Sequence, residues 1–389
     1  MSTNLPILCF SHLRWNFVYQ RPQHLLSRFG KKSQVLFIEE PIRLPNHSNV
    51  EGGARLEIVR QKNSSVRVVT IYISGDLSFE EETNVVSQRI QELLNEQQIG
   101  DYIAWFYSPM FLRYTKGLKP YLAIYDCMDE LAAFNFAPPE IKKMERLLLD
   151  QVDIVFTGGK TLYELKRHSH PEVYYFPSSI DKHHFAEARR KNISDPVDQE
   201  YIPHPRFGYH GVIDERIDLP LLAAIAEQRP DWHFIMIGPT AKISPSDLPQ
   251  RANIYYLGQK QYAELPQYLA GWDIAFMPFA LNASTKYISP TKTPEYLSGG
   301  KPVLSTPIND VVDPYGNLGL VEIISSPDEF IRAAERILSG QWDKNKWLKE
   351  TDDFLSHLSW DITFGTMLHV INQSLESKKS KTLKNGLYV

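Results

Sequence analysis

Cysteine is nearly absent from this chain of 389 residues, which contains only Cys9 and Cys127. Both lie in or beside short apolar runs, so two buried thiols are favoured over a disulfide framework. This cysteine usage fits a reducing compartment, and we therefore expect a cytoplasmic protein.

Long apolar runs are also missing. No stretch approaches the roughly 18 apolar residues of a membrane span. The N-terminal segment MSTNLPILCFSH has no basic region before its short apolar run, so it predicts a first strand rather than a signal peptide. The basic segment 378–385 favours a solvated, frayed end, with peripheral contact at the inner face of a membrane as the alternative.

No excess of positive charge is present, because 42 Lys and Arg face 46 Asp and Glu. A broad nucleic-acid footprint needs a basic surface, so we expect no nucleic-acid partner. The share of hydrophobic residues, 43%, is that of a soluble globular protein, and the length predicts about two or three domains.

Several catalytic motifs are lacking as well. No G-x-G-x-x-G follows a predicted strand, which argues against a dinucleotide-dependent oxidoreductase, and no G-x-S-x-G elbow occurs. The segment 158–161, GGKT, looks like the end of a P-loop. The glycine that a P-loop needs five residues before Gly159 is Ile154, so a tight strand-to-helix turn is predicted instead. The histidines lack metal-site spacing, and we expect neither a metal nor a cofactor.

Short apolar runs alternate with helical patterns along the whole chain, which predicts an α/β protein with parallel sheets covered on both faces. The predicted strands are Ile7–Phe10, Val35–Glu39, Val66–Tyr72, Ile103–Tyr107, Leu122–Asp126, Ile154–Thr157, Val173–Phe176, Arg206–His210, His233–Ile237, Ile254–Leu257, Ile274–Pro278, Val303–Ser305 and Val321–Ile324. The predicted helices are Pro22–Phe29, Thr83–Gln97, Pro138–Leu149, Lys160–Arg167, Leu219–Glu227, Tyr262–Ala270, Thr293–Ser298, Pro327–Ser339, Lys344–His357 and Trp360–Ser374.

A polar segment with three prolines interrupts this alternation and predicts an interdomain linker. The predicted units are an N-terminal Rossmann-like lobe 1–186, a linker 187–205, a C-terminal Rossmann-like lobe 206–358, a last helix 359–376 and a flexible basic tail 377–389. Because ligands bind outside the carboxyl ends of the strands in such sheets, we expect the functional residues in the loops that follow strands.

The most informative loop precedes the helix predicted to begin near Thr293. A helix N-terminus attracts anions, Lys292 adds a full positive charge, and Glu295 can accept hydrogen bonds from a pair of ribose hydroxyls. The alternative is an ordinary helix cap. The residues expected to bind a nucleoside diphosphate are Ser289, Pro290, Thr291, Lys292, Thr293 and Glu295.

The run S-P-T-K-x-x-E-Y-x-x-x-G-K-P-V resembles the C-lobe signature of retaining GT-B glycosyltransferases of family 4. The resemblance implies the GT-B fold, in which two Rossmann-like lobes face each other across a cleft and a C-terminal helix, here from Ser359-Trp360-Asp361, crosses back to the N-lobe. It implies that Glu295 binds the ribose of a sugar nucleotide. The family's second glutamate, which contacts the donor sugar, is replaced by Tyr287.

Other donor-side positions follow from the same resemblance. Arg216 would face the leaving phosphates together with Lys292, both as catalytic residues. The remaining positions implied for the nucleotide sugar are Gly211, Lys242, Gly258 and Tyr262, the last near the nucleobase. The stretches W-x-x-x-x-Q-R-P-Q-H (residues 15–24) and D-x-M-D-E-L (126–131) resemble a bacterial subgroup of cell-surface polysaccharide transferases that act in teichuronic-acid and S-layer glycan synthesis.

The acceptor is expected on the N-lobe, in the loop after the first strand and at the end of a later one. Amide, guanidinium and aromatic groups suit sugar binding, and the residues expected there are Trp15, Gln20, Arg21, His24 and Asp129. The alternatives are a core anchor for Trp15 and a structural ion pair for Arg21. Asp126 stands where the family usually presents a histidine to the donor sugar, so it is a third catalytic candidate, with a turn cap as the alternative.

We therefore expect a metal-independent glycosyltransferase that moves a sugar from a nucleoside-diphosphate sugar to a hydroxyl of a glycan or lipid-linked acceptor. Each preorganised cation at the departing diphosphate would lower the barrier by roughly 3–4 kcal/mol. Retention of configuration is implied by the resemblance alone. The alternatives are a GT-B sugar-nucleotide epimerase and a non-catalytic carbohydrate-binding paralogue, the second favoured by Tyr287.

Overall fold

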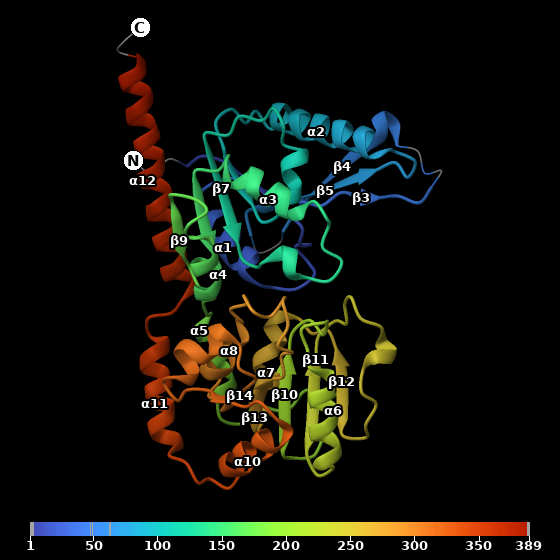
Figure 1. Cartoon of the computed structure of the whole chain (residues 1–389), viewed down its shortest axis with the longest axis vertical. Coiled ribbons are helices and arrows are strands. Elements are labelled where there is room, and N and C mark those ends of the chain that lie inside the picture. Colours follow the sequence, from blue (N-terminus) through green and yellow to red (C-terminus); the bar gives the residue numbers. More distant parts are fainter. Residues whose placement is uncertain (1–3, 47, 49, 62–63, 387–389) are drawn as a thin grey trace.

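A computed structural model describes residues 4–46, 48, 50–61 and 64–386. Figure 1 shows two lobes, one above the other, with the C-terminal helix running along the side of the upper, N-terminal lobe. Each lobe is built around its own predominantly parallel sheet, so the alternation of strand and helix in the sequence appears twice in the structure.

The N-terminal lobe has a sheet of nine strands in the order β3-β5-β2-β1-β6-β7-β8-β9, with β4 antiparallel to β5. Its strands are β1 Ile7–Ser11, β2 Val35–Glu39, β3 Ile42–Arg43, β4 Ala54–Arg60, β5 Val66–Ile73, β6 Ile103–Phe106, β7 Leu122–Cys127, β8 Ile154–Thr157 and β9 Val173–Tyr175. The central strands are apolar and buried on both faces, as in a sheet covered by helices on each side. The strands β3 and β4 are absent from the sequence prediction.

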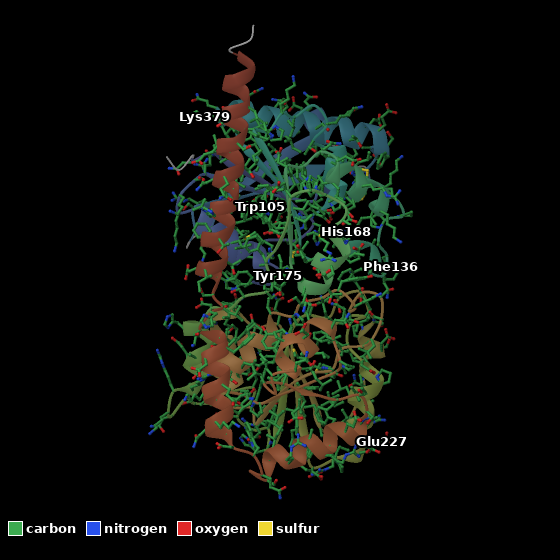
Figure 2. All side chains as sticks on the ribbon, turned by 60° about the vertical axis from the view of Figure 1, so that its left-hand side comes forward. Trp105, Phe136, His168, Tyr175, Glu227 and Lys379 are labelled. Atoms are coloured by element: carbon green, nitrogen blue, oxygen red, sulfur yellow. The ribbon has the colours of Figure 1, made fainter. Side chains whose placement is uncertain are left out.

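The helices of this lobe are α1 Arg21–Phe29, α2 Phe79–Glu96, α3 Ile141–Leu149 and α4 Lys160–Lys166. The short α5 Lys182–Ala186 that follows packs on the C-terminal lobe, where Phe185 joins the apolar core. Helix α2 begins at a capping box, in which the Ser78 hydroxyl accepts from the amide of Glu81. Two apolar clusters cover the two faces of the sheet, and Trp105 is fully buried in one of them (Figure 2). Phe136, by contrast, is 86% exposed at the edge of the lobe.

The C-terminal lobe has six parallel strands in the order β12-β11-β10-β13-β14-β15. Its elements are β10 Arg206–His210, α6 Leu219–Gln228, β11 His233–Ile237, β12 Ile254–Gly258, α7 Leu265–Ala270, β13 Ile274–Met277, α8 Lys292–Ser298, β14 Val303–Ser305, α9 Asn309–Val311, β15 Glu322–Ile323, α10 Pro327–Leu338 and α11 Lys344–Leu355. The strand order reverses at β10, which therefore lies at the topological switch point where such sheets bind ligands.

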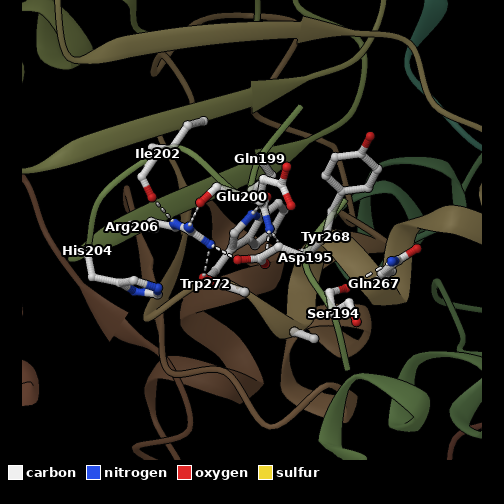
Figure 3. A network of polar contacts seen from close by, with 12 residues as sticks. Ser194, Asp195, Gln199, Glu200, Ile202, His204, Arg206, Gln267, Tyr268 and Trp272 are labelled. Atoms are coloured by element: carbon white, nitrogen blue, oxygen red, sulfur yellow. Dashed lines mark hydrogen bonds and ion pairs between the residues drawn. The ribbon is translucent and has the colours of Figure 1, made fainter. Parts of the chain in front are cut away.

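The predicted linker packs tightly on the C-terminal lobe. Gln199 is fully buried, where its side chain donates to the carbonyl of Tyr268 and accepts from the indole of Trp272 (Figure 3). Arg206 at the start of β10 forms an ion pair with Asp195. Ala188 and Ile202 also lie in the apolar core of this lobe, so much of segment 187–205 is an integral part of the C-terminal lobe.

Helix α12 spans Trp360–Gly386 and returns to the N-terminal lobe. Trp360, Met367 and Ile371 join the apolar cluster that also contains residues of α1. Lys378 donates to the carbonyl of Tyr121 and pairs with the Asp153 carboxylate at 2.7 Å. The prediction of a flexible tail is therefore wrong for residues 377–386, because the helix continues through them, while 387–389 lie outside the described residues. No helix in the described part of the chain is both long and apolar enough to cross a membrane.

Candidate active site

A cavity of about 800 Å³ lies between the two lobes. Its C-lobe wall comes from the carboxyl ends of β10 and β11 and from α8, and its N-lobe wall comes from the loop after β1 and from residues at the β4–β5 connection. The volume is that of a pocket for a small molecule or cofactor. The loops that follow strands do face this cavity, as the sequence predicts.

One face of α8 supplies a cation and a carboxylate to the cavity. Thr291, Lys292 and Glu295 all line it, because positions three and four residues apart share a side of a helix. Burial lowers the pKa of Lys292, and the nearby Glu295 carboxylate opposes that shift. Within the described residues no carboxylate lies within 4 Å of the Lys292 ammonium, so this cation is not tied up in a structural ion pair.

Glycine is required beside that lysine. Gly211 has φ of +149°, and a Cβ there would lie 2.1 Å from Cε of Lys292. Gly238 has φ of +145°, and its Cβ would lie 1.8 Å from the carbonyl oxygen of Gly211. The ends of β10 and β11 therefore leave the space through which the lysine reaches the cavity, and only glycine permits both backbone conformations without strain.

Glu295 faces the cavity from a buried position. Its side chain is 9% exposed, and burial raises its pKa to about 7, opposed by the Lys292 charge. The carboxylate lies 3.6 Å from Nε2 of His210, at the end of β10. Sequence reasoning missed His210, although its place at the end of the central strand was a signal for it.

Arg216, the second residue predicted to face the phosphates, has part of its charge offset by a carboxylate. Arg216 lines the cavity, but its guanidinium makes a bidentate pair with Asp214, with Nη2 to Oδ2 at 2.7 Å. Lys242 does not line the cavity, and its ammonium lies 3.7 Å from the Glu215 carboxylate. The ring of Phe134 from the N-terminal lobe lies against the charged groups of both Lys242 and Arg216. The prediction for Lys242 is corrected accordingly.

Asp129 lies on the N-lobe side of this charged group. It is half-buried and does not line the cavity. Burial raises its pKa to about 6, and the charges of Arg216 and Lys242 act in the opposite direction. The carboxylate therefore lies near the charges of Arg216 and Lys242 rather than in the cavity wall, where the sequence predicted an acceptor-binding residue.

Aromatic rings close the other end of the cavity. Tyr262 lines it and stacks on Tyr19 of the N-terminal lobe, with ring centroids 4.5 Å apart, and on His184 at 4.3 Å. Burial raises the pKa of Tyr262, whose hydroxyl has no hydrogen-bond partner within the described residues. Gly258 contributes only its carbonyl, which accepts from the amide of Gly238, so its expected place in the cavity wall is not found.

The loop after β1 forms the N-lobe wall, and two of its expected acceptor residues, Trp15 and Gln20, line the cavity. Glu39 at the end of β2 holds this loop, since its carboxylate accepts from the backbone amide of Trp15 at 2.8 Å. Gln23 donates to the Trp15 carbonyl, so the backbone is fixed on both sides. Trp15 is 7% exposed and packs edge-on against Phe37. It therefore anchors the loop in the core and also contributes to the cavity wall.

Three predicted residues are structural instead. Arg21 and Asp126 form a buried ion pair, with Nη2 to Oδ1 at 2.8 Å, and Arg21 also donates to the Phe176 carbonyl. Asp126 lies within β7, not beyond its end, and is fully buried. His24 stacks on Trp360 of α12 at 4.7 Å and so joins α1 to the returning helix. None of the three lines the cavity.

The start of the nucleotide motif also differs from the prediction. Thr293 is fully buried, with its hydroxyl against the Met277 sulfur. Ser289 and Pro290 do not line the cavity, and the Ser289 carbonyl instead accepts from the Ser178 hydroxyl of the N-lobe segment. Tyr287, at the position of the family's sugar-binding glutamate, packs against the N-lobe core and not into the cavity.

A second interlobe contact lies close by, at the GGKT turn. The Asp310 carboxylate, from α9 of the C-terminal lobe, accepts from the amides of Lys160 and Thr161 at 2.7 and 3.0 Å. A Cβ on Gly159 would lie 2.3 Å from Oδ2 of Asp310, which explains the glycine. The turn therefore fastens the two lobes to each other, and sequence reasoning did not foresee this role.

These features define a class of protein: two Rossmann-like lobes, a ligand cavity between them at the switch point of the second sheet, and a C-terminal helix that returns to the first lobe. This is the GT-B fold.

Comparison with known proteins agrees with this class. Residues 205–340, which make up most of the C-terminal lobe, match the family model described as Glycosyl transferases group 1. The chain is also 30% identical over 145 residues to TuaH of Bacillus subtilis (strain 168), a protein named for glycosyl transfer in teichuronic acid biosynthesis. That match covers 35% of this chain and 36% of TuaH, about a third of each.

Solved structures share the fold over nearly the whole chain. Sucrose-phosphate synthase of Thermosynechococcus elongatus has a TM-score of 0.67 at 13% identity and covers 96% of this chain and 100% of its own. An E. coli structure described as trehalose-6-phosphate bound with UDP-2-fluoro glucose has a TM-score of 0.65 at 13% identity, with coverage of 95% and 99%. The GT-B fold and the resemblance to glycosyltransferases predicted from the sequence are confirmed.

Proposed function

We propose that the protein transfers a glycosyl group from a nucleoside-diphosphate sugar to a hydroxyl of a glycan or lipid-linked acceptor in cell-surface polysaccharide synthesis. The observation that carries the proposal is the face of α8 in the interlobe cavity: a half-buried lysine that has no ion pair within the described residues, followed three residues later by a buried carboxylate. A diphosphate supplies the anion that Lys292 lacks, and a ribose supplies hydroxyl donors to Glu295.

The arrangement suits the departure of a diphosphate. When the bond between C1 of the sugar and the phosphate oxygen breaks, negative charge grows on that oxygen, and Lys292 and Arg216 stabilise it. Arg216 is held by Asp214 before the ligand arrives, so its guanidinium needs little reorganisation. Each such preorganised group lowers the barrier by roughly 3–4 kcal/mol. In this mechanism the two cations take the place of a metal, and the sugar retains its configuration at C1.

The acceptor binds on the N-lobe wall in this proposal. Trp15 and Gln20 present an aromatic edge and an amide to the cavity opposite α8, and these groups suit a sugar hydroxyl face. The protein acts in the cytoplasm at the inner face of the membrane: both cysteines are free and buried, and α12 carries exposed Lys379 and Lys381 beyond its contact with Asp153.

One observation favours a second candidate, a carbohydrate-binding paralogue that holds the nucleotide sugar without transferring it. Tyr287 removes the carboxylate that would contact the donor sugar and instead fills a contact with the N-lobe. No comparable observation favours a sugar-nucleotide epimerase, because the described cavity wall has Glu295 as its single carboxylate.

The test is a panel of UDP-, GDP- and dTDP-sugars incubated with the protein, with release of the nucleoside diphosphate as the readout. We expect slow hydrolysis of one nucleotide class without acceptor, and faster release when glycolipid extracts are added. Lys292→Met and Arg216→Met should each reduce turnover by roughly 100-fold or more. Tight nucleotide binding with no turnover under any condition would favour the paralogue, and no binding at all would refute both.

A further inference from the structure

His210 is a buried side chain in the wall of the cavity. Within the described residues its Nε2 atom has no hydrogen-bond partner and is shielded from solvent. That nitrogen lies 3.6 Å from Oε2 of Glu295, slightly too far for a hydrogen bond and close enough to form one after a small movement. A buried polar atom without a partner costs free energy, so its presence beside the cavity carboxylate needs a reason.

Packing fixes the direction of this ring. Phe185 lies parallel to it with centroids 5.9 Å apart, and Tyr296 meets it edge-on at 4.9 Å. The backbone amide of His210 donates to the Tyr296 hydroxyl at 2.8 Å. Because Tyr296 follows Glu295 on α8, the same contact ties the end of β10 to the helix that carries the carboxylate.

The electrostatics make His210 a neutral donor. Burial lowers its pKa well below the ordinary value, and the charge of Lys292 acts in the same direction. The groups that face Glu295 are Lys292 on its own helix, His210 from β10 and Tyr262 from the turn before α7. Of these, the imidazole and the Tyr262 phenol are uncharged donors, and Nε2 of the imidazole lies 3.6 Å from a carboxylate oxygen. The imidazole can therefore hold that oxygen by a hydrogen bond without adding charge to the site.

We propose that His210 is a positioning residue, which donates from Nε2 to one oxygen of Glu295 and leaves the other oxygen to accept from the ribose hydroxyls. This inference rests on the proposed function and narrows it. A carboxylate held in one orientation recognises a pair of vicinal hydroxyls, so the donor is a ribonucleoside diphosphate sugar and not a 2′-deoxyribonucleoside one.

The experiment compares UDP with 2′-deoxy-UDP, and GDP with 2′-deoxy-GDP, by isothermal titration calorimetry. We expect the wild-type protein to prefer the ribose form of its nucleotide by roughly tenfold or more, the value of a hydrogen bond to a charged group. His210→Phe keeps the aromatic packing and removes the donor, so the preference should fall to about threefold or less. His210→Gln restores an N–H donor and should recover most of the preference.

The matched control is His233→Phe, the same substitution in the same lobe at the opposite end of the adjacent strand, and it should leave the preference unchanged. If His210 had only a structural role, its substitution would weaken the binding of the ribose and deoxyribose nucleotides equally and leave the ratio of their affinities unchanged. The inference is overturned if His210→Phe keeps the wild-type ratio, or if the wild-type protein binds both forms equally well. Failure to bind any of the four nucleotides would instead refute the proposed function.

Discussion

Lys292→Met offers the sharpest test of the site, because it should move two quantities in opposite directions. Methionine keeps the length of the apolar stem and removes only the ammonium. Lys292 is half-buried, burial lowers its pKa, and no carboxylate of the described structure lies within 4 Å of its ammonium. Removing the charge should therefore raise the free energy of unfolding of the ligand-free protein.

Nucleotide binding should change with the opposite sign. A charge-assisted contact to phosphate contributes about 1.5–3 kcal/mol, so affinity for the nucleoside diphosphate should fall by roughly 10- to 150-fold. A second effect adds to the loss. The Lys292 charge lowers the pKa of Glu295, which stands at about 7, and without it the carboxyl group is protonated over more of the neutral range.

Chemical denaturation of the ligand-free protein and calorimetry with UDP or GDP measure the two quantities. Lys260→Met is the matched control, since Lys260 lines the same cavity but is already paired with Asp198. We expect that variant to lose little nucleotide affinity. An Lys292→Met protein that is less stable than wild type and binds nucleotide with unchanged affinity would refute the reasoning, because the lysine would then be a structural group.

Three further predictions follow from the same contacts. Glu295 has a pKa of about 7 in the folded protein, above its ordinary value of 4.5. Its contribution to the free energy of unfolding should therefore be complete below pH 4.5 and should be lost as the pH rises towards 7. Glu295→Gln should remove this decline in denaturation curves recorded across that pH range. Gly211→Ala should lower the free energy of unfolding by about 1–3 kcal/mol through strain at φ of +149° and should weaken nucleotide binding in calorimetry, because its Cβ displaces Lys292. Asp310→Asn should loosen the contact with the GGKT turn and increase the radius of gyration of the nucleotide-free protein in small-angle scattering, whereas an unchanged radius would show that this contact does not hold the lobes.

Much of the fold could be predicted from the sequence because each central strand is a short apolar run bounded by turn residues. Val35–Glu39, His233–Ile237 and Val303–Ser305 agree with the structure to the residue. The missed strand β4 is an exposed antiparallel strand at the sheet edge, with charged residues and no buried face to mark it. The tail was misjudged because its basic composition suggests solvation, while Lys378 finds a partner in Asp153, which no local pattern reveals.

Helix periodicity explains where the structure places the residues of the α8 segment. Lys292 and Glu295 share one face of α8 and both reach the cavity, whereas Thr293 lies about 100° round the helix and points into the core. Arg21 and Asp126 could not be assigned in the same way. They are 105 residues apart, and only the folded sheet shows that they pair with each other beneath the cavity.

The charges around the cavity also suggest a reason for a lysine without a nearby carboxylate at position 292. Evolution could have paired Lys292 with a carboxylate, as Arg216 is paired with Asp214, and the empty protein would then be more stable. A half-buried cation without a counter-ion is tolerated where a ligand supplies the anion, because binding then offsets the cost of partial burial and adds the attraction at the same time. The unpaired lysine is thus a stronger sign of an anionic ligand than the paired arginine, although both face the same cavity.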